Sequence, residues 1–272
     1  MQTVAYPGRP GAHSAAAAAK LFPEAELVPS ASFRAVTDSV TAAETSHGVL
    51  PIESTLAGSV AETHDLLARV PLSIVAEAVL PIHHVLAARG PVPLESLRAI
   101  RSHPAAFDQC RRMLAGLPRA LTVAAATTAD AAQQVAEGGG AYPEAAIASP
   151  EAARLYGLTV LVDDVGDGHA WTRFVSIAPY TRLGPAVSPR TAFSFFTDHR
   201  PGALHRAIEP LARAGLDLVQ LVSRPLPDSP WRYRFDAVLA GHGLDPAVRA
   251  ALAEVSAETR ELRILGLYDA AA

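Results

Sequence analysis

The chain has little of what builds disulfide-rich, metal-binding or membrane-spanning proteins. Cys110 is its one cysteine among 272 residues, which excludes an internal disulfide and a zinc site made of several cysteines. No apolar run approaches the roughly 20 residues that a membrane-spanning helix needs. The first residues lead directly into a predicted strand, so no signal peptide is expected. We therefore expect a cytoplasmic protein that makes no membrane contact.

Charge is also scarce and has no strong sign. Only 18% of the residues are charged and the net charge is −4, which gives no electrostatic footprint for nucleic acid or an anionic membrane. An acidic substrate stays open, because binding it needs only a local positive site. Hydrophobic residues make up 50% of the chain, enough for a large core, and the length suits one large or two ordinary domains.

Strands and helices alternate in the predicted structure of residues 1–180. This alternation predicts an α/β domain with mainly parallel sheets. Ser14 is the predicted N-cap of the first helix. The predicted strands are 3–6, 25–28, 48–52, 72–80, 84–88, 99–101, 121–124, 145–148 and 159–162, and the predicted helices are 14–22, 33–45, 59–68, 104–114, 128–137 and 150–156.

The pattern changes after Pro179. Residues 180–189 are rich in proline and glycine without periodicity, which is typical of a linker. A βαββαβ series follows, and this is the ferredoxin-like order. Two domains are therefore predicted. The second consists of predicted strands 191–197, 216–222, 231–240 and 263–268 and predicted helices 203–214 and 246–257.

Two strand-to-helix turns of the first domain have residues suited to anions. Residues 6–14 join a strand, a glycine turn and a helix start, where free backbone N–H groups attract a carboxylate or phosphate. Residues 51–60 contain Glu53 at the end of a predicted strand, then the hydroxyls of Ser54 and Thr55, and then Gly58-Ser59 at a predicted helix start. Hydroxyls at a helix N-terminus can bind an anionic group. An ordinary turn and a serine that only caps its own helix are the alternatives.

Two further segments place polar side chains at helix starts. His103 precedes Pro104, which suits the first helical position, and it binds substrate, transfers a proton or is a partly buried structural histidine. Thr127 heads another helix and is most simply an N-cap. The pair His83-His84 lacks a third nearby ligand, so no metal site is expected.

The sharpest motif is Trp171-Thr172-Arg173-Phe174. It follows a turn rich in glycine and aspartate and leads into an apolar strand at 175–177. A polar pair at the mouth of a strand is a usual location for chemistry in α/β enzymes. Arg173 can hold a carboxylate with two hydrogen bonds, and the Thr172 hydroxyl can donate a proton to a leaving oxygen.

Taken together, these segments resemble prephenate dehydratase, and the resemblance covers almost the whole chain. The order and spacing of the motifs agree with those of the family. The residues that carry the resemblance are Gly8, Gly11 and Ser14; Pro51-Ile52-Glu53 with Gly58-Ser59-Val60; Ile82-His83-His84; His103-Pro104 with Gln109-Cys110; Thr172-Arg173-Phe174; Gly202-Ala203-Leu204; and Ser223-Arg224-Pro225.

The resemblance implies a fold and an activity. It implies a catalytic domain of two α/β lobes, like a periplasmic binding protein, at residues 1–180, and a ferredoxin-like ACT regulatory domain at 190–269 that pairs into a homodimer or homotetramer. The implied reaction of this lyase turns prephenate into phenylpyruvate, carbon dioxide and water, within phenylalanine biosynthesis. Aromatisation supplies the driving force, so no metal or organic cofactor is expected. No chorismate mutase segment precedes the first strand, so the monofunctional form is expected.

The resemblance also implies residue roles. Thr172, Arg173 and Glu53 are the implied catalytic residues, with Thr172 donating a proton to the leaving hydroxyl. Anion holders for the two carboxylates of prephenate are Arg173, hydroxyls and helix N-termini. The implied substrate-binding residues are Ser14, Ser54, Thr55, Gly58, Ser59, His103, Thr127 and Phe174, and the implied L-phenylalanine-binding residues are Gly202, Ala203, Leu204, Ser223, Arg224 and Pro225.

Some positions depart from the family pattern. Ser54, Ala105 and Ala170 stand where the family has amide side chains, which predicts a larger pocket or a different substrate such as arogenate. Val222 replaces the glutamate of the regulatory motif, which predicts weak or absent inhibition by phenylalanine. Two alternatives stay open: an arogenate dehydratase or decarboxylase of the same fold, and a non-catalytic small-molecule or amino-acid sensor.

Overall fold

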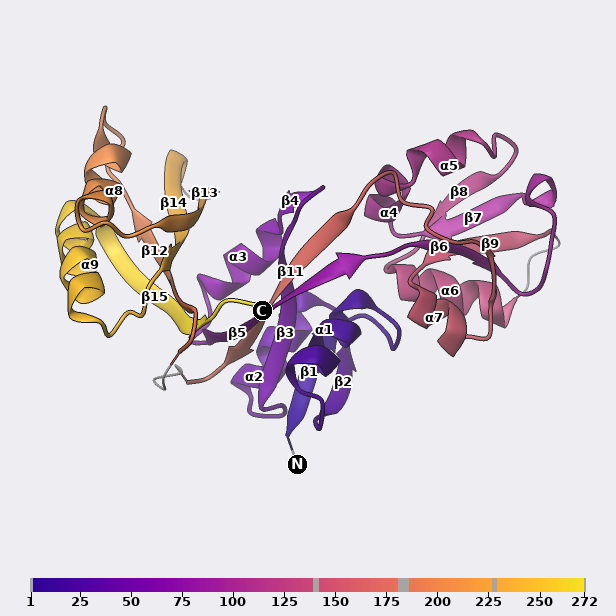
Figure 1. Ribbon diagram of the computed structural model, residues 1–272, viewed down its shortest axis with the longest axis horizontal. Helices are drawn as coiled ribbons and strands as arrows, with labels where there is room; N and C mark the ends of the chain where they lie inside the picture. Colours follow the sequence, from indigo (N-terminus) through magenta and orange to yellow (C-terminus); the bar gives the residue numbers. More distant parts are fainter. Residues whose placement is uncertain (1, 139–141, 181–185, 227–228, 272) are drawn as a thin grey trace.

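A computed structural model describes residues 2–138, 142–180, 186–226 and 229–271. The chain forms three bodies in a row: a first lobe at the centre, a second lobe at one end and a C-terminal unit at the other (Figure 1). One sheet has the strand order β13-β14-β12-β15-β5-β11-β3-β1-β2 with β4 beside β3, and the other has the order β10-β6-β9-β7-β8. No described helix is long and apolar enough to cross a membrane.

The first lobe is a mixed sheet with helices on both faces. Strand β1 runs parallel to β2 and β3, whereas β11 runs antiparallel to β3 and β5. Apolar residues of α1 pack on one face, and those of α2 and α3 pack on the other. The strands are β1 (Thr3–Pro7), β2 (Glu26–Ser30), β3 (His47–Ser54), β4 (Gly58–Ser59), β5 (Ser73–Ile82) and β11 (Ala170–Ala178), and the helices are α1 (His13–Leu21), α2 (Phe33–Thr41) and α3 (Ala61–Leu67).

The second lobe is inserted between β5 and β11. Its strand β7 runs parallel to β8 and β9, and β6 runs antiparallel to β9 and β10. The elements are β6 (Val85–Ala88), η1 (Leu94–Ser96), β7 (Ala99–Ser102), α4 (Pro104–Gln109), α5 (Arg111–Ala115), β8 (Leu121–Ala124), α6 (Thr128–Glu137), β9 (Glu144–Ala148), α7 (Pro150–Leu155) and β10 (Thr159–Val162). The two-lobed α/β prediction is confirmed.

The expectation of mainly parallel sheets is wrong. The chain leaves the first lobe along β5 and returns along β11, and β11 lies between β3 and β5 in the opposite direction to both. A chain that crosses between two lobes and back must enter the first sheet from the far end, which makes that strand antiparallel. The two lobes are therefore joined by two extended crossings, visible in Figure 1.

Three local predictions also differ from the structure. The predicted helix 104–114 breaks at Cys110, whose backbone angles, φ −128° and ψ 32°, are not helical. The predicted helix from Ser59 begins instead at Ala61, because Gly58 and Ser59 pair with β3 as the short strand β4. Ala12, not Ser14, is the N-cap of α1.

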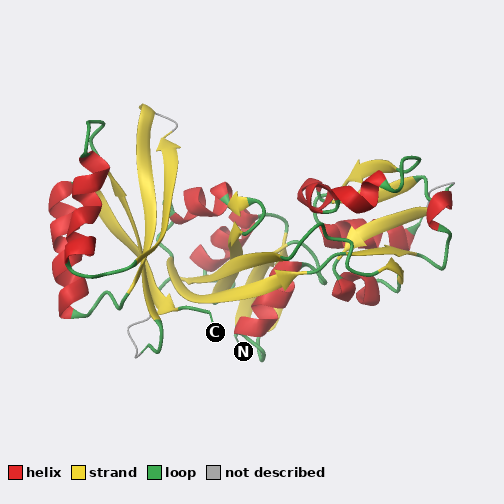
Figure 2. Cartoon of the chain, turned by 45° about the horizontal axis from the view of Figure 1, so that its top comes forward, coloured by secondary structure: helices red, strands yellow, loops and turns green. Residues whose placement is uncertain are grey.

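The C-terminal unit has the predicted βαββαβ order. Its strands pair antiparallel in the order β13-β14-β12-β15, and helices α8 and α9 cover the outer face of the sheet, so that the other face turns toward the first lobe (Figure 2). Half of the predicted linker, residues 181–185, lies outside the described residues. The elements are β12 (Pro189–Phe196), α8 (Ala203–Arg213), β13 (Leu218–Leu226), β14 (Ser229–Ala240), α9 (Pro246–Glu258) and β15 (Arg260–Asp269).

One close approach joins the C-terminal sheet to the first lobe. Gly266 of β15 pairs in parallel with Ile74 of β5. A Cβ atom at Gly266 would collide with the Ile74 carbonyl oxygen, so the contact requires glycine. The sheet of the first lobe and the sheet of the C-terminal unit thereby become one sheet of ten strands.

Candidate active site

A cavity of about 280 Å³ lies between the two lobes. Both lobes contribute to its walls, as is usual for small-molecule sites at domain boundaries. The first lobe supplies Pro7, His13, Ser14, Phe33, Pro51, Thr172 and Phe174, and the second supplies His84, His103, Ala105, Gln109 and Thr127.

Five of the predicted site residues meet at this cavity. Ser14 lies in the first turn of α1, and His103 and Thr127 are the N-caps of α4 and α6. Thr172 and Phe174 lie two residues apart on β11 and therefore share one face of the strand. Segments far apart in the sequence thus come together around the Thr172 hydroxyl.

Arg173 and Glu53 do not join them. Alternation along β11 turns Arg173 to the opposite face, where its Nη1 lies 3.1 Å from Glu53 Oε2 and its Nε lies 3.8 Å from Glu77 Oε2. A register shift between Arg173 and Phe174 brings Glu53 opposite Arg173. Arg173 and Glu53 therefore lie outside the cavity lining, and a catalytic role for either residue stays a prediction.

The predicted residues from the end of β3 onward also lie outside the cavity lining. The Ser54 hydroxyl accepts hydrogen bonds from the Leu56 and Ala57 backbone N–H groups at 3.4 and 3.5 Å. Thr55 Oγ1 accepts one from the Trp171 backbone at 3.0 Å. The Ser54 hydroxyl therefore holds its own turn, and the Thr55 hydroxyl ties the loop to β11. Gly58 and Ser59 are exposed in β4 and do not start a helix.

Three imidazoles make the cavity polar without charging it. Burial, and then the charge of His84, lowers the pKa of His13 to about 4. Burial also lowers the pKa of His84 and that of His103. The rings of His13 and His84 meet edge to face at 5.7 Å, and His84 Nε2 lies 2.9 Å from Gln109 Oε1. All three rings are neutral at pH 7, and no lining residue that the structure describes carries a charge.

Helix N-termini supply the positive potential that side chains do not. Helices α1 and α6 both begin at the cavity, at His13 and Thr128. Their unpaired N–H groups and dipoles attract anions without a lysine or arginine. Thr127 Oγ1 accepts the Asp130 backbone N–H at 3.0 Å, which confirms the predicted N-cap.

Sequence reasoning missed His13, His84 and Gln109 at this cavity. His84 belongs to the Ile82-His83-His84 motif of the family resemblance, for which only metal binding was considered as a role, and Gln109 belongs to the motif that begins at His103. In the described part of the chain, no group of three or more histidine, cysteine, aspartate or glutamate residues is placed to hold a metal ion.

A second cavity of about 680 Å³ continues the cleft past Phe33 and His103. Here Arg9, in the loop after β1, forms an ion pair with Asp130 of α6 in the second lobe. Ser149 Oγ donates a hydrogen bond to the Gly11 carbonyl at 2.7 Å. The loop after β1 therefore bridges the two lobes beside the cleft.

The three missing amides are not equivalent. Ala105 lines the cavity, whereas Ala170 is buried at the start of β11 and Ser54 is the last residue of β3. Ala105 therefore has the position to alter the substrate directly. That Ser54 and Ala170 also shape the substrate pocket stays a prediction.

The predicted effector residues gather at one end of the C-terminal sheet. Phe196 and Arg224 both lie opposite Arg234 in the strand register, so the loop to Gly202 and the end of β13 share that end. Gly202 has a φ of +76° and precedes α8. Ala203 and Leu204 follow it in α8, Ser223 and Pro225 are exposed on β13, and Arg224 turns toward α3.

This architecture defines a cleft protein for a small polar molecule. The family model for prephenate dehydratase matches residues 4–181. A solved structure of prephenate dehydratase from Arthrobacter aurescens, in complex with L-Phe, is 31% identical with a TM-score of 0.90, and the match covers 99% of this chain and 90% of that one. The chain belongs to the prephenate dehydratase family.

Two other similar proteins carry different descriptions. Arogenate dehydratase 1 of Petunia hybrida is 35% identical over 97% of this chain, which spans 66% of the petunia protein's length. GqqA, described as a novel type of quorum quenching acylase, has a solved structure that is 32% identical with a TM-score of 0.86, and the match covers 99% of this chain and 98% of that one.

Proposed function

We propose that this protein is a prephenate dehydratase that converts prephenate into phenylpyruvate, carbon dioxide and water in phenylalanine biosynthesis. The observation that carries the proposal is Thr172, held on the cavity face of β11 within the family motif. Loss of carbon dioxide pushes electrons through the ring and expels the ring hydroxyl, and a proton from Thr172 makes that hydroxyl a better leaving group. No cofactor is required, because aromatisation drives the reaction.

The substrate's negative charge is held by helix N-termini in this proposal. Prephenate has two carboxylates, and α1 and α6 both begin at residues that line the cavity. Ser14 and His103 supply polar contacts, Thr127 fixes the start of α6, and Phe174 supplies an apolar wall. Arg173 and Glu53 support β11 from its other face, where their ion pair joins it to β3.

We further propose residues 1–180 as the catalytic domain and residues 190–269 as an ACT regulatory domain, in a cytoplasmic homodimer or homotetramer. L-phenylalanine is the proposed effector, supported by its presence in the Arthrobacter relative's structure. Val222 lies opposite Asp236 in the strand register, on the face turned toward α3. A valine there offers no carboxylate to an effector's ammonium group, so the proposed inhibition is weak.

Two other activities have some support. Ala105 at the cavity wall and the similarity to an arogenate dehydratase favour arogenate as the competing substrate. Similarity to GqqA favours removal of an acyl group as a second candidate, for which His103 lines the cavity as a neutral base. The Thr127 hydroxyl beside it donates to Asp130 Oδ2 at 2.7 Å instead of to an imidazole, which ranks this candidate lower.

A turnover assay with purified protein tests these proposals. Prephenate, arogenate and an N-acyl amide are offered in parallel, and products are identified by mass spectrometry. Phenylpyruvate from prephenate is the expected result. A greater kcat/KM for arogenate than for prephenate would mean that arogenate is the substrate. If the N-acyl amide alone is converted, the protein is an acylase and the proposed function is wrong.

A further inference from the structure

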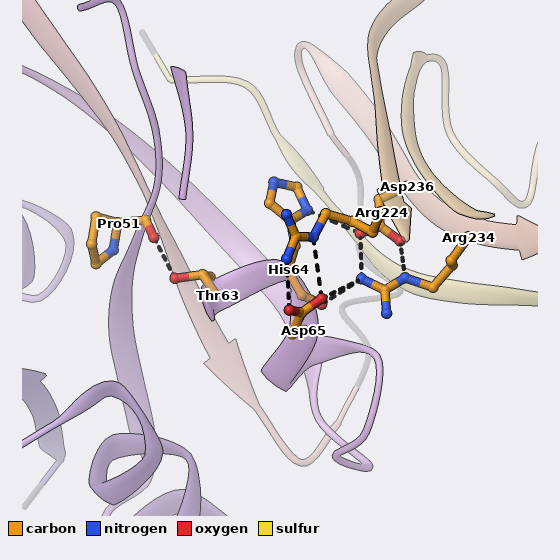
Figure 3. Close-up of polar contacts among 7 residues, drawn as sticks. All are labelled: Pro51, Thr63, His64, Asp65, Arg224, Arg234 and Asp236. Carbon is orange, nitrogen blue, oxygen red and sulfur yellow. Dashed lines mark hydrogen bonds and ion pairs between the residues drawn. The ribbon is translucent and has the colours of Figure 1, made fainter. Parts of the chain in front are cut away.

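A cluster of charged side chains attaches α3 of the first lobe to the C-terminal sheet (Figure 3). Arg224 of β13 donates to Asp65 of α3 through Nε at 3.2 Å and Nη2 at 2.7 Å. Arg234 of β14 bonds the same carboxylate at 3.3 Å and the His64 carbonyl at 3.1 Å. His64 Nδ1 lies 3.1 Å from Asp236 Oδ2. Two consecutive residues of α3 are thus held by two strands of the C-terminal unit.

The cluster is balanced in charge and buried on one side. Its two arginines face two aspartates. The side chains of Arg234 and Asp236 are 8% and 5% exposed, whereas those of Arg224 and Asp65 are 22% and 39% exposed. Burial would raise the pKa of Asp236, but hydrogen bonds from His64 and Arg234 outweigh it and hold that pKa below its usual value. Such paired arginine–carboxylate contacts fix geometry more than they add stability.

Thr63, the residue before His64 in α3, contacts a residue that lines the cleft. Thr63 is fully buried, and its Oγ1 donates a hydrogen bond to the Pro51 carbonyl at 2.6 Å. Pro51 lines the cavity and lies opposite Phe174, another lining residue. Figure 3 shows Thr63 directed to Pro51 while His64 and Asp65 meet the arginines.

Helix α3 cannot hold this position by itself. It has only 7 residues, and its N-cap, Val60, provides no side-chain hydrogen bond. Helices this short are unstable in isolation, so their placement depends on the contacts around them. The charged cluster on one side and the apolar core around Leu67 on another are such contacts.

We propose that Asp65 and Arg224 are positioning residues of the active site: they set the place of α3 and, through the Thr63 hydroxyl, the place of Pro51 and the cleft wall. The inference rests on the proposed function for its kinetic readout. A small displacement of a binding wall costs substrate affinity more directly than it costs the proton transfer at Thr172. The C-terminal unit therefore acts on substrate binding through one short helix.

The test uses Asp65→Asn, Arg224→Gln and their combination in the full chain, with prephenate as substrate. Coupling along such a contact changes affinity by about two- to thirtyfold, so KM is expected to rise within that range while kcat changes less. The double variant is expected to resemble the single ones, because both remove the same contact. Asp65→Glu keeps the charge and should restore most of the affinity. Thr63→Val should raise KM in the same way.

Two matched variants serve as controls. Thr37→Val removes an equally buried hydroxyl, bonded to the Arg34 carbonyl at 2.8 Å within α2, which no arginine of the C-terminal unit contacts in the described structure. Glu254→Gln breaks the ion pair with Arg213 inside the C-terminal unit. Both should leave KM unchanged. A KM shift of the same size in either control, or unchanged KM in the Asp65 and Thr63 variants, overturns the proposal.

Amide hydrogen exchange separates this inference from the proposed function. Faster exchange at residues 52–60 in Asp65→Asn and Thr63→Val, but not in Thr37→Val, is expected whether or not prephenate is turned over. If the wild-type protein fails on prephenate, the function is wrong and exchange alone decides the coupling. Exchange that is unchanged in this segment contradicts the coupling even in an active enzyme.

Discussion

The cleft and the contact between α3 and the C-terminal sheet differ in how they use charge. The cavity that contains Thr172 has neutral imidazoles and helix N-termini but no charged lining residue among those described. The contact between α3 and the C-terminal sheet has two arginines and two aspartates within hydrogen-bonding distance. A substrate that brings its own negative charge is best met by dipoles that need no counter-ion. Fixed charge pairs suit a contact that must have one geometry.

The largest test of this contrast is Thr172→Val. Removing the proton donor while keeping the side-chain shape should reduce kcat by about 10²- to 10⁴-fold. Binding of prephenate, measured by calorimetry, should persist because the anion holders are intact. Thr191→Val is the control, since its buried hydroxyl bonds the Gly241 carbonyl in the C-terminal unit. Undiminished turnover would exclude Thr172 as the donor.

The charged contact should respond in stability. Asp236→Asn removes the buried carboxylate that contacts both His64 and Arg234 and leaves Arg234 only its longer carboxylate contact, with Asp65, so the free energy of unfolding should fall by about 3 kcal/mol. Denaturant titration measures this loss. Glu254→Gln, at an exposed ion pair, should cost less than about 1 kcal/mol. Equal losses in the two variants would mean that the buried contact contributes no more to the free energy of unfolding than an exposed ion pair does.

The neutral cleft predicts a pH dependence of stability. The pKa of His13 is about 4 in the folded chain, below its ordinary value of 6.5, so between these values the unfolded chain binds a proton that the folded chain does not. Stability should be full above pH 6.5 and fall as the pH drops toward 4, by at most about 3 kcal/mol. Unfolding at pH 7 and pH 4.5 measures the loss, and His13→Phe should reduce it. An unchanged loss in that variant would place its source elsewhere.

Substrate choice should show the smallest effect. Ala105→Gln restores an amide at the cavity wall, and one hydrogen bond is worth about 1 kcal/mol, or about fivefold in kcat/KM. The ratio of kcat/KM for prephenate to that for arogenate should change by about this factor. Ala19→Gln, exposed on α1, should leave the ratio unchanged. A constant ratio in both variants would remove Ala105 from specificity.

Sequence patterns predicted the parts of the site that local chemistry determines. Thr127 is an N-cap as its spacing indicates, and Ser14, His103 and Thr172 meet at one cavity. The motifs of Ser14, His103 and Thr127 stand at helix starts, and these helix starts lie where the two lobes face each other.

The parts that depend on register could not be read from the sequence. Arg173 and Thr172 are adjacent in the chain but lie on opposite faces of β11, and a bulge beside Ile52 turns Glu53 to meet Arg173. The amino-acid composition predicts neither the return of the chain that places β11 between β3 and β5 nor the bulge. The same holds for α3, whose contacts come from strands more than 150 residues later in the sequence.

The junction at Gly266 and Ile74 has a consequence for the isolated first half of the chain. Strand β15 covers one side of β5, so removal of the C-terminal unit would leave β5 as an open sheet edge. Unprotected edges recruit strands from other molecules and promote aggregation. The C-terminal unit therefore also protects the edge of β5. Because it is part of the same chain as the two lobes, β5 is not available to pair with a strand of another molecule.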